Sequence, residues 1–207
     1  MKTLNTLVLS IFALYLFGCA STSITGFKNP DFKGTVKNVI VYASVGDLQM
    51  RQTMENEIAI AFSEGGYGAI SSMNVFSPAK KYTESEMVQI LKQKKIEGAL
   101  IVSITDAHTT QSYVPKSTNE KTKGEGYVLG DYLYYKSTTK TETTGGYYIN
   151  KPVVSFESVL FNVEDGLQIW LASSTTKGNA FAKMGTLSSS LGSNILESLV
   201  SQGILRK

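Results

Sequence analysis

The sequence predicts an α/β (α+β) protein in which a β-α-β-α-β start is followed by antiparallel hairpins and a C-terminal helix around one mixed sheet. In the first half, apolar β-branched segments alternate with segments whose apolar residues recur at helical spacing. In the second half, alternating segments are separated by glycine-containing turns. Residues 35–207 are long enough for a single domain with its own core, and residues 19–34, rich in Ser, Thr, Gly and Lys, are expected to form a tether.

A strand and a helix are expected to open the domain. Residues 39–43 read Val-Ile-Val-Tyr-Ala, an apolar run typical of a strand buried on both faces of a sheet. Asp47 follows as a helix N-cap, and residues 48–62 carry an apolar stripe at helical spacing. The glycine-rich residues 65–68 should end this helix, and a short strand is expected at residues 69–73.

A capping box marks the start of a second helix. The Thr83 hydroxyl can accept a hydrogen bond from the first turn, while Glu86 reaches back to the threonine amide. Apolar residues follow at helical spacing, and residues 98–104 then form a third apolar, β-branched strand. Because strands and helices alternate, we expect right-handed crossovers and an at least partly parallel sheet.

The segments after residue 104 are expected to form a loop and antiparallel strands. Residues 105–131 are polar and contain one proline and three glycines, so they predict a long surface loop or a frayed hairpin. Residues 132–143 and 147–163 alternate as strands do, with Gly145 and Gly146 as the turn between them.

A last strand and a helix are expected to complete the domain. A tight turn at residues 164–166 leads into a strand at residues 167–173, which contains the only tryptophan, Trp170. Apolar residues then recur at helical spacing over residues 187–200, and Gly203 should end this C-terminal helix.

The N-terminal residues have the pattern of a secretory signal. Lys2 supplies the positive start, and residues 7–17 form an apolar run that is too short to span a bilayer. Residues 16–19 read Leu-Phe-Gly-Cys and contain the only cysteine of the chain. This stretch resembles the lipobox of bacterial lipoproteins, which implies that residues 1–18 are a lipoprotein signal peptide and that Cys19 is the site of lipid attachment. An ordinary signal peptide or an uncleaved anchor remains the alternative.

The lipobox also has consequences for compartment and partners. Ala20 stands where inner-membrane lipoproteins carry an aspartate, so the resemblance implies an anchor in the outer membrane, on its periplasmic face. A lipidated Cys19 leaves no thiol for a disulfide or a redox cycle. Without residues 1–18 the chain has 19 Lys and Arg against 17 Asp and Glu, which is not the charge signature of nucleic-acid binding.

A second resemblance covers most of the domain. Residues 162–170 read Asn-Val-Glu-Asp-Gly-Leu-Gln-Ile-Trp and resemble a strand-turn-strand found in bacterial outer-membrane lipoproteins with a fold like the N-terminal domain of the Tol translocation protein. The strand at residues 39–43, the helix with Arg51 and Glu57, and the strand at residues 98–104 resemble the same group. It includes the curli secretion lipoprotein and the lipoprotein activator of penicillin-binding proteins. The resemblance implies fold and compartment more than function.

The sequence offers little support for catalysis. His108 is the only histidine, which leaves no second imidazole for a two-histidine metal site. Asp106 would share its face if the strand at residues 98–104 continued, so a weak metal contact is an alternative to the preferred interpretation, a surface histidine. No Gly-x-Ser-x-Gly motif is present, and no cofactor is expected. We therefore expect a non-catalytic binding or assembly module with an envelope protein as partner. A subunit of an oligomeric secretion or pore complex and a cell-wall glycan-processing enzyme are the alternatives.

Clustered tyrosines are the remaining candidate site. Six of the eleven tyrosines lie between residues 127 and 148, interleaved with threonines. Tyrosine combines a large apolar area with a polar tip, which suits protein interfaces. The candidate partner-binding residues are Tyr132, Tyr134, Tyr135, Tyr147 and Tyr148. Three other interpretations remain, namely cross-strand pairs that stabilise an exposed ribbon, a glycan contact, and a membrane-facing hairpin.

Overall fold

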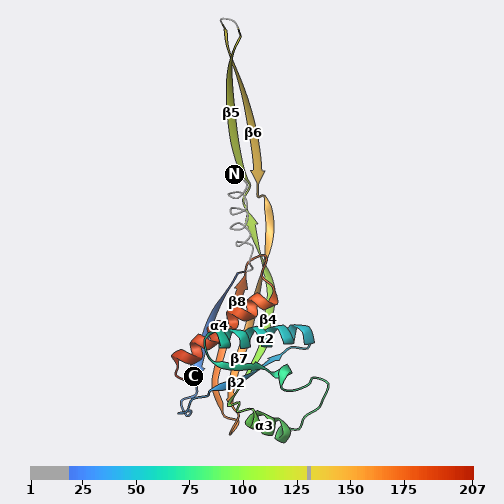
Figure 1. The fold of residues 1–207 in the computed structure, drawn as a ribbon, viewed down its shortest axis with the longest axis vertical. Helices are drawn as coiled ribbons and strands as arrows, with labels where there is room; N and C mark the ends of the chain where they lie inside the picture. The colour runs from blue at the N-terminus through green and yellow to red at the C-terminus, as the bar shows by residue number, and fades with distance from the viewer. Residues whose placement is uncertain (1–18, 130–131) are drawn as a thin grey trace, which may run out of the picture. The chain divides into compact units, whose positions relative to one another are not determined.

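A computed structural model of the chain describes residues 19–129 and 132–207 (Figure 1), except for the side chains of residues 122–138. The predicted signal peptide, residues 1–18, lies outside the described residues. The chain divides into two compact units. The first unit contains residues up to 110 and residues 151–207, and the second contains residues 111–150.

The first unit is built on a six-stranded sheet with the strand order β1-β8-β7-β4-β2-β3. β2 pairs in parallel with both β3 and β4, whereas β8 pairs antiparallel with β1 and β7. This confirms the predicted α/β class with one mixed sheet. The strands are β1 (Ala20–Lys28), β2 (Asn38–Ser44), β3 (Gly68–Ser71), β4 (Gly98–Val114), β7 (Tyr147–Asn162) and β8 (Gln168–Gly178).

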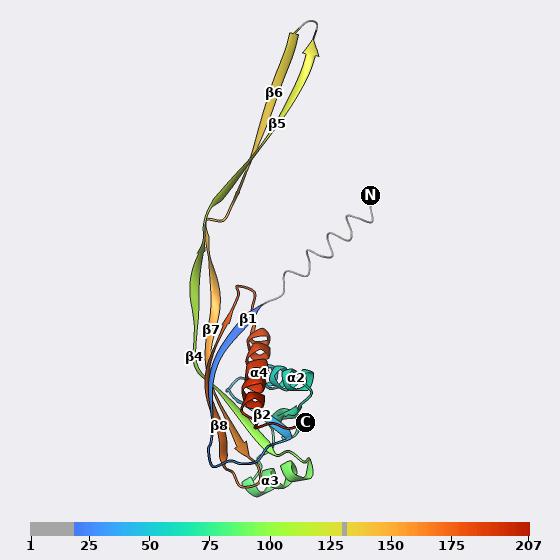
Figure 2. The same cartoon turned by 90° about the vertical axis from the view of Figure 1, so that its left-hand side faces the viewer.

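Helices cover both faces of this sheet. α2 (Leu48–Glu64) and α4 (Met184–Ser201) lie on the same side (Figure 2), where they enclose the main core with Val39 and Val41 of β2. Successive side chains of a strand point to opposite faces, so Ile40 faces the other way. There it packs with Leu91 of α3 (Glu84–Gln93) in a second, smaller core.

The predicted helix caps are confirmed. Oδ1 of Asp47 accepts a hydrogen bond from the Met50 amide at 2.6 Å, which satisfies a free donor at the start of α2. At α3, the Glu86 amide donates to Oγ1 of Thr83 at 3.2 Å, and the Thr83 amide donates to Oε2 of Glu86 at 2.7 Å. These two bonds form the expected capping box.

α2 and α4 approach closely because α4 has a glycine at their crossing. A Cβ atom added to Gly192 would lie 2.9 Å from the Ile58 Cα and 3.0 Å from the Ala61 Cβ. Any side chain at this position would therefore push the helix backbones apart. The serines that surround Gly192 in α4 keep the same face small.

The predicted tether is wrong, because residues 20–28 form β1. This edge strand is in register with β8 from Ala20 opposite Gly178 to Lys28 opposite Trp170. Half-buried and exposed residues alternate along its whole length. Thr22 contacts Ser190 of α4, and Ile24 packs against the main core. The strand was not predicted because its many Ser and Thr residues hide this alternation in the sequence.

Residues 105–114 and 117–129 form strands and not the predicted surface loop, so the alternative, a hairpin, is closer to the structure. β4 continues to Val114, and β5 (Ser117–Leu129) follows after two residues. β5 pairs antiparallel with β6 (Tyr132–Thr144), so the partner of residues 132–143 is β5 and not residues 147–163 as predicted. Polar residues occupy both faces of this ribbon where its side chains are described, so no apolar periodicity marked it.

Gly145 and Gly146 do not form the predicted hairpin turn. Both have positive φ, 87° and 76°, and the Gly146 amide donates to the Val114 carbonyl at 2.8 Å. A Cβ at Gly145 would overlap the Pro115 carbonyl. The glycine pair therefore lies opposite the β4–β5 connection and joins β6 to β7 within the second unit.

Candidate functional site

The predicted attachment residue, Cys19, is exposed and directly precedes β1. Its carbonyl accepts a hydrogen bond of 2.8 Å from the Asn179 amide, and the next residue, Ala20, is already in register with Gly178. The sheet therefore begins one residue after the predicted attachment residue. A lipid on the Cys19 sulfur would be joined to a folded strand edge without an intervening linker.

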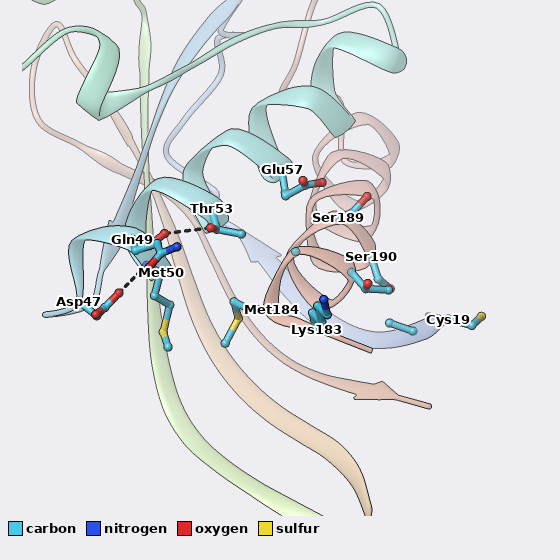
Figure 3. A pocket seen from close by; sticks show the side chains of 13 residues that line it. Cys19, Asp47, Gln49, Met50, Thr53, Glu57, Lys183, Met184, Ser189 and Ser190 are labelled. Carbon is cyan, nitrogen blue, oxygen red and sulfur yellow. Dashed lines mark hydrogen bonds between the residues drawn. The ribbon is translucent and has the colours of Figure 1, made fainter. Parts of the chain in front are cut away.

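A groove of about 930 Å³ lies between α2 and α4, with Cys19 at one end (Figure 3). Glu57 of α2 lies on one side of the groove and Ser189 and Ser190 of α4 lie on the other. Lys183, the N-cap residue of α4, also lines it. The groove thus offers two carboxylates, those of Asp47 and Glu57, one ammonium group and several hydroxyls.

The serines of this groove belong to a packing layer and not to a nucleophile–base pair. Oγ of Ser190 lies 2.8 Å from Oγ1 of Thr22, which in turn lies 2.8 Å from Oγ1 of Thr176. Ser188 is fully buried, and its hydroxyl has no hydrogen-bond partner among the described residues. Ser188 and Ser190 are therefore packing residues of α4.

A second polar cluster is buried on another face of α2, around Glu55. The Glu55 side chain is fully buried. Its carboxylate accepts hydrogen bonds from the Ala43 amide (3.1 Å), Arg51 Nε (2.8 Å), Ser71 Oγ (2.7 Å), Ser72 Oγ (2.8 Å) and the Met73 amide (3.1 Å). The carboxylate is thus enclosed by donors from α2, β2 and the turn after β3.

Arg51 completes this cluster. Its Nη2 donates to Oγ of Ser72 at 2.8 Å, and its guanidinium lies 4.3 Å from the centre of the Tyr42 ring. Burial raises the pKa of Glu55, but the hydrogen bonds from Arg51, the two serines and the Ala43 amide outweigh it and leave the pKa below 4.5. Glu55 is therefore an ionised structural group that joins α2 to the sheet.

The sequence interpretation missed Glu55, although a signal was present. Arg51 and Glu55 are spaced i, i+4 on the helix stripe that also carries the buried Met54 and Ile58. A charged pair on an apolar helix face indicates a buried ion pair. The sequence identified Arg51 only through the resemblance to outer-membrane lipoproteins.

The structure describes two of the five candidate tyrosines fully. The side chains of Tyr147 and Tyr148 are 55% and 68% exposed, and the Tyr148 ring lies 5.1 Å from the ring of Tyr113, which is 50% exposed. All three lie in the second unit. For Tyr132, Tyr134 and Tyr135 the backbone belongs to β6, and the side chains lie outside the described residues.

The predicted pair of Asp106 and His108 is present on β4. Nδ1 of His108 lies 2.7 Å from Oδ2 of Asp106, and both side chains are more than half exposed. In the part of the chain that the structure describes, no group of three or more His, Cys, Asp or Glu side chains is placed to hold a metal ion.

The fold and site define a mixed α/β protein whose single, exposed cysteine directly precedes the edge strand of its main sheet. No protein-family model and no curated protein matches the sequence. Within residues 19–129 and 132–207, no helix combines the length and the apolar character needed to span a membrane.

Several solved structures resemble the chain. A PelC dodecamer from Paraburkholderia phytofirmans is 14% identical with a TM-score of 0.49, over 90% of this chain and 99% of that one. Lipoprotein GNA1162 from Neisseria meningitidis is 14% identical with a TM-score of 0.40, over 80% and 96%. A PDZ domain protein from Parabacteroides distasonis is 10% identical with a TM-score of 0.31, over 97% and 40%. At these values the similarities do not indicate what this chain binds.

Proposed function

We propose that this chain is a lipid-anchored protein of the bacterial envelope that acts as a non-catalytic binding or assembly module. The observation that carries the proposal is Cys19, the only cysteine, which follows a lipobox-like stretch and is exposed at the start of β1. Ala20 in the next position supports the outer membrane, at its periplasmic face. A membrane is thus one partner, through the lipid on Cys19, and an envelope protein is the other.

The anchor would be essentially permanent. Each acyl methylene buried in a bilayer contributes about 0.8 kcal/mol to membrane binding. Two or three acyl chains therefore hold a protein on the membrane, whereas a single chain binds only reversibly. A module anchored in this way meets its partners by motion in the membrane plane.

Replacing Cys19 with serine is expected to abolish acylation and to release the protein from the membrane fraction. Serine lacks the thiol that receives the diacylglyceryl group, whereas the fold does not depend on the exposed side chain. Mass spectrometry of the N-terminal peptide and fractionation of cells measure the two effects. Ser23→Ala, an exposed change on β1, is the matched control. An unmodified Cys19 peptide from the native protein would refute the anchor.

The partner-binding surface is proposed to include the tyrosines of the second unit. Tyr113, Tyr147 and Tyr148 each expose half or more of their side-chain surface. Exposed aromatic residues are common among the few that dominate binding energy at protein interfaces. Burial of these rings by a partner would remove a large apolar area from water.

Changing Tyr147 and Tyr148 together to serine is expected to weaken partner binding by about 2 kcal/mol or more, roughly 30-fold, with little change in melting temperature. The partner is first identified by cross-linking to the wild-type protein, and the affinity of the purified pair is then measured. Phe27→Ser, which removes an aromatic side chain 69% exposed on β1, is the control. A lower melting temperature with unchanged affinity would instead show that the tyrosines stabilise the ribbon.

A further inference from the structure

The turn between β8 and α4 lies beside Cys19 and exposes an aromatic side chain. The Asn179 amide donates to the Cys19 carbonyl at 2.8 Å. Two residues later, Phe181 is 66% exposed, which makes it one of the two most exposed phenylalanines among the described residues, with Phe27. A single hydrogen bond thus links the anchor residue to the turn that carries Phe181.

The turn is fixed on both sides of Phe181. Oδ1 of Asn179 accepts a hydrogen bond from the Phe181 amide at 3.0 Å, and the Asn179 carbonyl accepts one from the Ala182 amide at 3.1 Å. Ala182 and Met184 pack against the main core. The exposed position of Phe181 is therefore set by the backbone, and little conformational entropy remains to be lost when the ring is buried by a partner.

Basic residues flank the turn. Lys177 is exposed at the end of β8, opposite Ser21, and Lys183 precedes α4. Neither β1 nor residues 167–196 contain an acidic residue. Asp47 and Glu57 line the α2–α4 groove together with Lys183. The turn itself therefore presents an exposed aromatic side chain between two basic residues in the sequence.

We propose that this turn is a second membrane contact, in which Phe181 inserts into the interface of a bilayer while Lys177 and Lys183 contact anionic phospholipid head groups. The proposal rests on the lipid attachment at Cys19, since acyl chains on that residue fix the bilayer surface beside the turn. Aromatic and basic side chains are the pair that favours the membrane interface. We favour a bilayer over a protein as the occupant of this surface, because the turn directly adjoins the anchor residue.

The contact limits how the protein rotates on its anchor. A body held only by a flexible linker turns freely, whereas Cys19 followed at once by β1 and flanked by Phe181 gives two points of contact. The end of the first unit that carries Cys19, Gly178 and the start of α4 then faces the membrane.

The test uses the Cys19→Ser protein, so that binding through the turn is measured without the lipid. We expect a small fraction of this protein to sediment with vesicles of phosphatidylglycerol and phosphatidylethanolamine. Phe181→Ser should lower the affinity for these vesicles about tenfold. Changing Lys177 and Lys183 to glutamine should lower binding to these vesicles and remove its salt dependence. The control is Phe27→Ser, because Phe27 is equally exposed but lies at the far end of β1, about 23 Å from Ala20.

A second measurement places the ring in the lipidated protein. Phe181→Trp should show fluorescence that is quenched by brominated phospholipids, whereas Phe27→Trp should not. Trp170 is buried and contributes the same background to both variants. Equal quenching of the two variants, or equal vesicle binding by Phe181→Ser and Phe27→Ser, would overturn the proposal. Membrane fractionation of wild-type protein tests the lipid separately, so failure of the turn is distinguishable from failure of the anchor.

Discussion

Glu55→Gln is expected to lower the free energy of unfolding by about 3–5 kcal/mol, the range for removing one partner of a buried ion pair. Glutamine keeps the size of the side chain but loses the charge that faces Arg51, and its amide NH₂ group meets donors instead of acceptors. The Ala43 amide and the two serine hydroxyls lose a charged acceptor at the same time. Chemical denaturation monitored by circular dichroism measures the change.

The control for this prediction lies on the same helix. Glu57→Gln makes the same chemical change two residues away, on the groove side of α2, where no ion pair to Glu57 is found among the described residues. It is expected to change the unfolding free energy by less than about 0.5 kcal/mol. Similar values for the two variants would show that the Glu55 cluster does not stabilise the fold.

Acid should destabilise the wild-type protein through the same cluster. The pKa of Glu55 is lower in the folded protein than its ordinary value of 4.5, so the folded state favours the ionised form. The contribution of ionised Glu55 to the free energy of unfolding is complete above the ordinary pKa of 4.5. This contribution is lost as the pH falls through the pKa of Glu55 in the folded protein. Between pH 5 and the acid limit, the Glu55→Gln variant is therefore expected to lose less unfolding free energy than the wild-type protein does. Denaturation at a series of pH values measures both losses.

Trp170→Ala is expected to cost about 3–5 kcal/mol of unfolding free energy because it empties the largest fully buried side-chain volume of the described core. The indole lies directly over Gly26 of β1, where a Cβ would approach its Nε1 to 2.7 Å. Trp170 thus fills the space that the glycine leaves between the edge strand and α4. Thermal and chemical unfolding of the variant measure the loss.

A control at the neighbouring residue distinguishes the loss of core packing from an effect on strand β8 itself. Leu171 follows Trp170 on β8, faces the opposite side of the sheet and is 36% exposed. Leu171→Ala changes the same strand at a partly solvated position, so we expect a loss of about 1 kcal/mol. A loss as large as that of Trp170→Ala would show that the strand, and not the filled core volume, determines stability here.

Features encoded by a few neighbouring residues were predictable from the sequence. Asp47 and the Thr83–Glu86 pair form their caps from side chains within three residues of the bonds they make, so spacing alone defines them. The β2 strand is predictable because its apolar run is buried on both faces. These elements need no knowledge of distant parts of the chain.

Features that depend on distant partners were not predictable. The sequence of β1 looks like a linker because few of its residues are apolar and its pairing partner, β8, lies about 150 residues away. Where the side chains of the β5–β6 ribbon are described, residues 117–121 and 139–144, polar residues occupy both faces, so this part of the ribbon leaves no hydrophobic period in the sequence. The Glu55 cluster joins β2, α2 and the turn after β3, and only folding brings these donors together.

The pairing of β1 with β8 also bears on the order of events during biogenesis. A chain delivered N-terminus first presents residues 19–28 long before residues 168–178 exist outside the membrane, and β1 has no other strand partner among the described residues. Contacts of such large sequence separation form late in folding. Throughout that interval Cys19 would be offered to the processing and acylating enzymes as extended chain. Under the proposed function, closure of the sheet would then incorporate the acylated residue into the folded protein.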